Sequence, residues 1–149
     1  MKSLASVEVM SEIRARLRTV RVDDRACWGK MTAKQMMRHL NCSYEMALGE
    51  RVVEPVPGPP PVVIKWLALR SGLRWKRNFQ TVPELKQAIA QHADDRFDEL
   101  VSVAIERTEE LAKGPSCAPT HPMFGPMTVE DWMRWGYLHA DHHLRQFGR

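Results

Sequence analysis

Cysteine, long apolar runs and strand patterns are scarce in this 149-residue chain, and each absence narrows the class of protein. The three cysteines, Cys27, Cys42 and Cys117, are far apart and odd in number, which argues against a disulfide framework or a site of paired thiolates. No apolar run approaches the roughly 20 residues that a membrane-spanning helix needs. The N-terminus lacks the apolar core of a secretion signal. We therefore expect a cytoplasmic protein with no membrane partner.

Positive charge is only slightly in excess, with 22 basic and 18 acidic residues, but the excess is local. One stretch has a single carboxylate, Glu54, and six basic residues: Arg51, Lys65, Arg70, Arg74, Lys76 and Arg77. Such a stretch could bind nucleic acid or a small anion. No nucleic-acid-binding motif accompanies it, so a solvated surface is the favoured interpretation and a nucleic-acid partner is not expected.

Four long helices are predicted from start signals and from the spacing of apolar residues. They cover residues 3–19, Thr32 to Gly49, Thr81 to Lys113, and Thr128 to near the C-terminus. The last three each open on a capping box, in which a threonine is followed three residues later by a side chain that can bond back to it. The pattern predicts an all-α fold, a four-helix bundle with long crossover connections, formed by one domain over residues 1–149.

The connection from Gly49 to Thr81 is long for a compact domain. It begins with a proline-rich segment that excludes regular structure. A short helix over residues 62–69 is predicted to follow, with Trp66 and Leu69 directed inward. Long connections often form lids or pocket walls, so we expect residues 53–80 to influence the choice of substrate.

Histidine is concentrated on the last predicted helix, on the side expected to be buried. At 3.6 residues per turn, one face carries Trp132, Trp135, Gly136, His139, His143 and Gln146. His139 and His143 differ by about 40° around the helix axis, so both could reach one ion, whereas His142 points nearer the flank. Neutral imidazole is a good ligand for divalent metals. The pair alone is explained equally well by metal binding or by packing near a helix C-terminus.

A third ligand would have to come from another helix. His39, beside the apolar stripe of the second helix, is the best candidate, and His92 on the third helix is its rival. Three nitrogen ligands with open positions are typical of a catalytic zinc site, where a bound water or thiolate becomes reactive. For His92, and for His121 in the loop before the last helix, ordinary packing is the favoured interpretation.

Further residues could support or line such a site. Gln146, one turn beyond His143, either orients a ligand or caps the helix end. Gly136 leaves space for a ligand or for a close helix, and His121 could form a wall of the pocket. Tyr44 could donate a proton, and packing at the edge of the core explains it as well. The catalytic residue itself stays unassigned.

Two blocks of the sequence resemble a known family. Residues 28–40 read WGKMTAKQMMRHL and resemble the opening motif of a DinB-like branch of unknown function. Residues 121–128 together with 139–148 resemble the closing motif of that branch. The wider group is the DinB/YfiT-like superfamily of metalloenzymes, and the resemblance spans nearly the whole chain. It implies a four-helix bundle of the up-down-down-up type and a divalent metal bound by His39, His139 and His143.

The resemblance is less specific about the reaction. Relatives include thiol-dependent transferases and a mycothiol-dependent isomerase, and homodimers are frequent among them. It therefore implies a metal-dependent S-transferase or hydrolase that activates a low-molecular-weight thiol, or water, toward a small electrophilic substrate. We expect zinc or nickel as the metal and a homodimer as the assembly. The alternative is a non-catalytic, metal-stabilised binding or dimerisation module.

Overall fold

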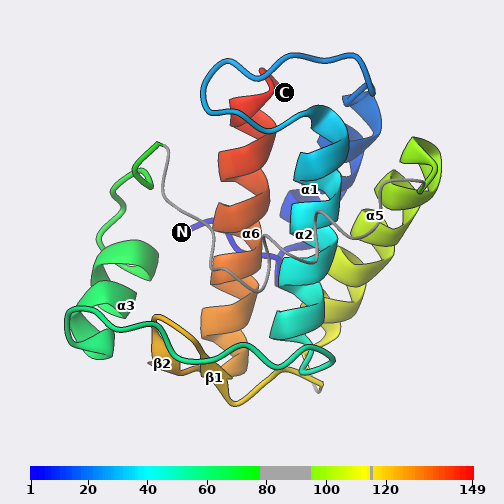
Figure 1. Ribbon diagram of the computed structural model, residues 1–149. Helices are drawn as coiled ribbons and strands as arrows, with labels where there is room; N and C mark the ends of the chain where they lie inside the picture. The colour runs from blue at the N-terminus through cyan, green and yellow to red at the C-terminus, as the bar shows by residue number, and fades with distance from the viewer. Residues whose placement is uncertain (78–94, 115) are drawn as a thin grey trace.

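The computed structural model describes residues 1–77, 95–114 and 116–149. Within these residues the regular secondary structure is almost entirely helical, and long loops connect the helices (Figure 1). The long helices are α1 (Val7–Thr19), α2 (Ala33–Ala47), α5 (Phe97–Lys113) and α6 (Val129–Gln146). The connections contain a shorter helix, α3 (Pro61–Leu69), and a hairpin of two short antiparallel strands, β1 (Thr120–His121) and β2 (Gly125–Pro126). The predicted all-α helical bundle is confirmed.

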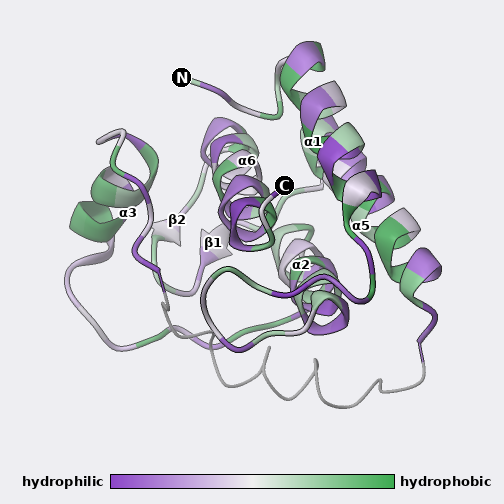
Figure 2. Ribbon diagram, turned by 90° about the horizontal axis from the view of Figure 1, so that it is seen from above, coloured by the Kyte–Doolittle hydropathy of each residue, from purple (hydrophilic) through white to green (hydrophobic). Residues whose placement is uncertain are grey.

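The packing order of the four long helices places α2 beside α6. Both α2 and α1 contact α5 and α6, and α5 also touches α6. On its remaining side α6 contacts α3, which lies apart from the other helices (Figure 2). α6 therefore faces the core of the bundle on one side and α3 with its flanking loops on the other.

The starts of α2 and α6 follow directly from the local sequence. The hydroxyl of Thr32 accepts the N–H of Gln35 at 3.2 Å, and the Gln35 side chain accepts the N–H of Thr32 at 2.9 Å. Thr128 and Asp131 form the same reciprocal pair at the start of α6. Each box gives partners to two backbone N–H groups that the helix cannot satisfy itself. Both predicted starts are confirmed.

The predicted helix from Thr81 to Lys113 is wrong as one continuous helix. Arg96 has extended backbone angles, φ −72° and ψ 134°, and α5 begins only after it. Asp98 and Glu99 then occupy the first turn, where carboxylates face the positive end of the helix dipole and favour a new start. The predicted start at Thr81, and His92 with it, lie outside the described residues.

The first helix also starts later than predicted. Its cap is Ser6, whose hydroxyl accepts the N–H of Val9 at 3.3 Å, so the helix begins at Val7. Leu4 lies in the preceding turn and is still buried, because its side chain packs into the bundle ahead of the helix. Because Leu4 continues the helical spacing of apolar residues, the sequence predicts a start about one turn too early.

α3 buries less of its surface than the sequence predicts. Leu69 is fully buried, as expected, but the prediction for Trp66 is wrong, because its side chain is 59% exposed. A nine-residue helix that is apolar on several sides can bury only the side that meets its neighbours, here α6 and β2. Val62 and Leu67 are exposed as well. Among the described residues, no helix is both long and apolar enough to cross a membrane.

Candidate metal centre

Three buried histidines converge between α2 and α6. His39 comes from α2, and His139 and His143 come from successive turns of α6. One ring nitrogen of each lies within 4.8 Å of the others, and the Nε2 atoms of His39 and His139 are 2.9 Å apart. The structure thus brings together the three histidines that the sequence singles out. Among the described residues, no fourth histidine, cysteine or carboxylate belongs to this group.

Burial keeps the three imidazoles neutral at physiological pH. It lowers the pKa of His39 to about 4, with a smaller contribution from the charge of His142. Burial also lowers the pKa values of His139 and His143 well below 6.5, and the neighbouring histidines lower them further. A metal binds the neutral form of imidazole, so the site is already in the protonation state that binding requires.

The donor arrangement fits a divalent cation. Two nitrogen lone pairs cannot face each other at the 2.9 Å that separates His39 and His139 without a proton or a cation between them. The Nδ1 atoms of both residues are buried and have no hydrogen-bond partner in the described part of the chain. A cation bound by all three Nε2 atoms would replace this single contact by three coordinate bonds. Three neutral imidazoles suit zinc and nickel in particular.

The outer nitrogen of His143 is the one with a partner. Its Nδ1 lies 2.8 Å from Oε1 of Gln146, and the Gln146 amide donates to the backbone carbonyl of Trp28 at 2.9 Å. That carbonyl can only accept, so the amide nitrogen must face it and Oε1 must face His143. Because Oε1 is also only an acceptor, the proton of His143 resides on Nδ1. Its Nε2 is then the atom with a free lone pair.

Aromatic rings surround the histidine group. The rings of Trp135 and Trp75 lie 4.7 Å and 6.1 Å from that of His139, measured between centroids. Tyr44 is fully buried at 6.4 Å from His139, and its hydroxyl donates to the carbonyl of Gly136 at 3.4 Å. Burial raises the pKa of Tyr44 to about 12, so it stays a neutral hydroxyl. Trp75 comes from the loop after α3, where no periodic signal in the sequence marks it as a neighbour of the site.

The space at Gly136 serves helix packing. A Cβ atom at this position would lie 2.7 Å from Cδ1 of Leu4 and 2.8 Å from Cδ2 of Leu111. Of the two alternatives left open by the sequence, a ligand or a close helix, the contact with Leu111 of α5 corresponds to the second. Gly136 lets α6 approach α5 and the N-terminal segment closely.

His142 lies beside the group and does not belong to it. Its ring makes edge contacts with Trp28 and His143, at centroid distances of 6.0 Å and 5.1 Å. Trp75 covers it from another side at 6.1 Å. His142 is buried by these rings, and burial lowers its pKa. It therefore makes a suitable comparison for the three converging histidines.

His121 packs in an aromatic cluster next to the site. Its ring stacks on Phe124 at 4.2 Å between centroids and contacts Trp132 and Trp135. Its Nδ1 accepts the N–H of Met123 at 3.1 Å, which holds the turn between β1 and β2. It is not part of the histidine group. Burial lowers the pKa of His121 to about 3.

His121 should make the fold sensitive to acid. The unfolded chain takes up a proton at a pKa near 6.5, whereas folded His121 does so at about 3. Its contribution to stability is therefore complete above pH 6.5 and decreases by about 1.4 kcal/mol per unit as the pH falls toward 3. His121→Asn keeps an acceptor for the N–H of Met123 but removes the titrating group. Between about pH 6.5 and 4.5 we expect the free energy of unfolding of this variant to fall by about 2 kcal/mol less than that of wild type. Urea unfolding of chelator-treated protein measures this, and equal losses in both proteins would contradict it.

Comparison with known proteins places the site within a family. Residues 8–147 match the family model described as the DinB superfamily. The matched range runs from the first turn of α1 to the last residues of the chain and includes all three converging histidines. Searches of curated proteins and of solved structures gave no match.

Proposed function

Because the chain belongs to the DinB superfamily, we propose that it is a divalent-metal-dependent enzyme that activates a low-molecular-weight thiol, or water, for transfer to a small electrophilic substrate. His39, His139 and His143 would hold the metal, and zinc and nickel are the ions that best suit three imidazoles. One observation carries the proposal: three buried, neutral histidines present ring nitrogens within 4.8 Å of one another.

The protein's own residues prepare this site for a reactive ion. A bound divalent cation would lower the pKa of a coordinated thiol or water and so supply a nucleophile at neutral pH. Gln146 holds the ring of His143 with its Nε2 directed to the other two histidines. The rings of Trp75 and Trp135 pack against His139 and limit the access of water to it. A dry site strengthens the electrostatic effect of any bound cation.

The alternative is a metal-stabilised binding or dimerisation module without catalysis. A structural zinc site is typically closed by four protein ligands, whereas a catalytic site has three and keeps a position for water or substrate. The group formed by the described residues has three donors. This number favours an enzyme over a structural site.

The experiment that tests the proposal combines metal analysis with a thiol-transfer screen. We expect the purified protein to contain about one divalent ion per chain. It should consume glutathione, mycothiol or another small thiol in the presence of an electrophile such as chlorodinitrobenzene, and a chelator should abolish this activity until zinc or nickel is restored. A fully metallated protein that is inactive with every thiol and in ester hydrolysis would support the module. A folded protein that binds no divalent metal would contradict both.

We also propose that the protein assembles as a homodimer, as the resemblance to the superfamily implies. Light scattering should then give a mass of twice the 17.2 kDa of one chain. A mass equal to that of one chain at micromolar concentration would contradict the proposal. A cytoplasmic location stays a prediction from the sequence.

A further inference from the structure

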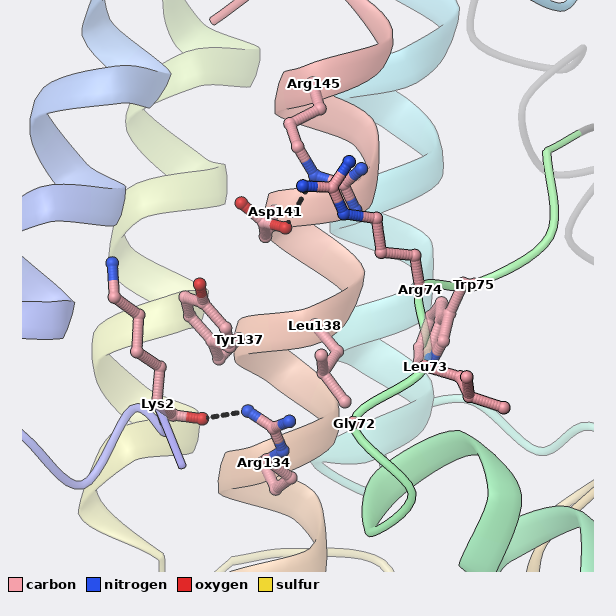
Figure 3. Close-up of a pocket in the computed structure, with 10 residues that line it drawn as sticks. All are labelled: Lys2, Gly72, Leu73, Arg74, Trp75, Arg134, Tyr137, Leu138, Asp141 and Arg145. Carbon is pink, nitrogen blue, oxygen red and sulfur yellow. Dashed lines mark hydrogen bonds and ion pairs between the residues drawn. The ribbon is translucent and has the colours of Figure 1, made fainter.

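A basic pocket lies between α6, the N-terminal segment and the loop that follows α3 (Figure 3). Its volume is about 370 Å³, which is within the range of pockets that bind small molecules. Four cationic side chains line it, Lys2, Arg74, Arg134 and Arg145, and the carboxylate among its described lining residues is Asp141. The histidines of the candidate metal centre are not part of this lining.

The carboxylate does not balance the charge of the pocket. Asp141 binds Nε of Arg145 at 2.8 Å and Nη1 of Arg16 at 2.9 Å, so it is shared between two guanidinium groups. The ammonium of Lys2 is paired with the carboxylate of Glu12 at 2.6 Å, so its charge is already neutralised. The remaining positive charge belongs to the arginines.

Arg134 has polar partners but no anionic partner among the described residues. Its Nε donates to the carbonyl of Leu69 at 3.2 Å, and its Nη1 donates to the carbonyl of Lys2. These bonds fix the guanidinium at the lower end of the pocket in Figure 3. Neutral carbonyls orient the group without cancelling its charge, and its partial burial lowers the pKa of Arg134. An anion in the pocket would stabilise it.

Arg74 adds a second cation without a counter-ion. Within the described residues its side chain has no hydrogen bond and no ion pair, and the residue is exposed. Figure 3 shows its guanidinium directed toward that of Arg145, beside Asp141. Two like charges directed to one place repel each other unless an anion lies between them. The nearby carboxylate is already occupied by Arg145 and Arg16.

We propose that this pocket binds a small organic anion, a carboxylate or a phosphate, through Arg74, Arg134 and Arg145. A planar guanidinium donates two parallel N–H groups to either oxyanion, so the same side chains suit both chemistries. Trp75 and Leu138 give the pocket an apolar wall against which the carbon skeleton of such a ligand can pack. The proposal is independent of metal binding, because no histidine ligand takes part in it.

Calorimetric titration of the full chain with succinate and with inorganic phosphate tests the proposal. We expect saturable binding of one anion per chain at low ionic strength, and Arg74→Gln should weaken it at least about tenfold, because a charged hydrogen bond is lost. The Arg74 side chain is exposed and makes no hydrogen bond or ion pair among the described residues, so this variant should fold normally. Arg18→Gln, which removes an exposed arginine of α1 outside the pocket, is the matched control and should leave binding within about twofold of wild type. Tighter binding of succinate would identify a carboxylate ligand, and tighter binding of phosphate a phosphate ligand.

Chelator-treated protein separates this pocket from the metal centre. Binding that persists after metal removal and is lost in Arg74→Gln supports the proposal, even if the proposed enzyme activity is not found. Binding that disappears with the metal and is unaffected by Arg74→Gln would place the anion on the metal and overturn the proposal. Equal weakening in Arg74→Gln and Arg18→Gln, or no saturable binding of either probe, would also overturn it.

Discussion

Replacing His139 by alanine is expected to weaken the binding of zinc or nickel by more than about 100-fold, which exceeds the effect typical of residues that only support a ligand. His139 is central to the group: its Nε2 is 2.9 Å from that of His39, and its ring is 4.9 Å from that of His143 between centroids. Without it, two nitrogens from two helices remain, and two ligands hold an ion far less firmly than three. Competition with a chromophoric chelator measures the affinity, and elemental analysis after dialysis measures the occupancy.

The same loss is expected for His39→Ala and His143→Ala, and His142→Ala is the matched control. His142 lies on the same helix, is buried, and contacts His143, but it offers no nitrogen to the group. Its replacement should therefore leave one metal ion per chain. Thermal unfolding of the chelator-treated variants shows whether each one folds without metal. A full equivalent of metal in all three ligand variants, or an equal loss in His142→Ala, would refute the ligand assignment.

The parts of the fold that the sequence predicts well are those decided within a few residues. The capping boxes at Thr32 and Thr128 are local, because the threonine and its partner are three residues apart and need no other element. The exposure of Trp66 is decided elsewhere. Whether one side of a short apolar helix is buried depends on which neighbours cover it, and the contacts of α3 with α6 and β2 leave Leu69 buried and Trp66 exposed. Apolar spacing alone does not contain this information.

The candidate site likewise has a part that local sequence predicts and a part that depends on long-range packing. His139 and His143 are one turn apart, so helical periodicity alone places them on one side of α6. The residues do not decide between His39 and His92, because the choice depends on which histidine the fold brings close to His139 and His143. The family resemblance favours His39, and the structure brings that histidine to within 2.9 Å of His139. Long-range packing, not periodicity, completes the group.

The role of Gln146 depends on a long-range contact, so the sequence leaves it open. Its position one turn after His143 is compatible with supporting the ligand and with capping the helix end. The deciding contact is the hydrogen bond from its amide to the carbonyl of Trp28, a residue 118 positions away in the chain. That bond sets which end of the amide faces His143. No local pattern predicts a contact of this sequence separation.

Replacing Gln146 by methionine is expected to weaken metal binding by about 10- to 100-fold. This is the range found for residues that orient a metal ligand through a hydrogen bond. Methionine has a similar length but cannot accept the Nδ1–H of His143. The proton is then no longer held on Nδ1, and the form of His143 protonated on Nε2 becomes populated. In that form Nε2 has no lone pair for the metal. Binding then requires a change of tautomer, which reduces the binding free energy.

A spectroscopic measurement separates this positioning role from a loss of stability. Nitrogen-15 NMR of the metal-free protein should show His143 protonated on Nδ1 in wild type and a mixture of tautomers in Gln146→Met. Gln146→Glu restores an acceptor at the same distance from the backbone, although it gives up the bond to Trp28. It should therefore recover the Nδ1–H form and most of the metal affinity. If Gln146→Met kept both the tautomer and the affinity of wild type, the orientation of His143 would have to come from packing against His39 and His142 alone.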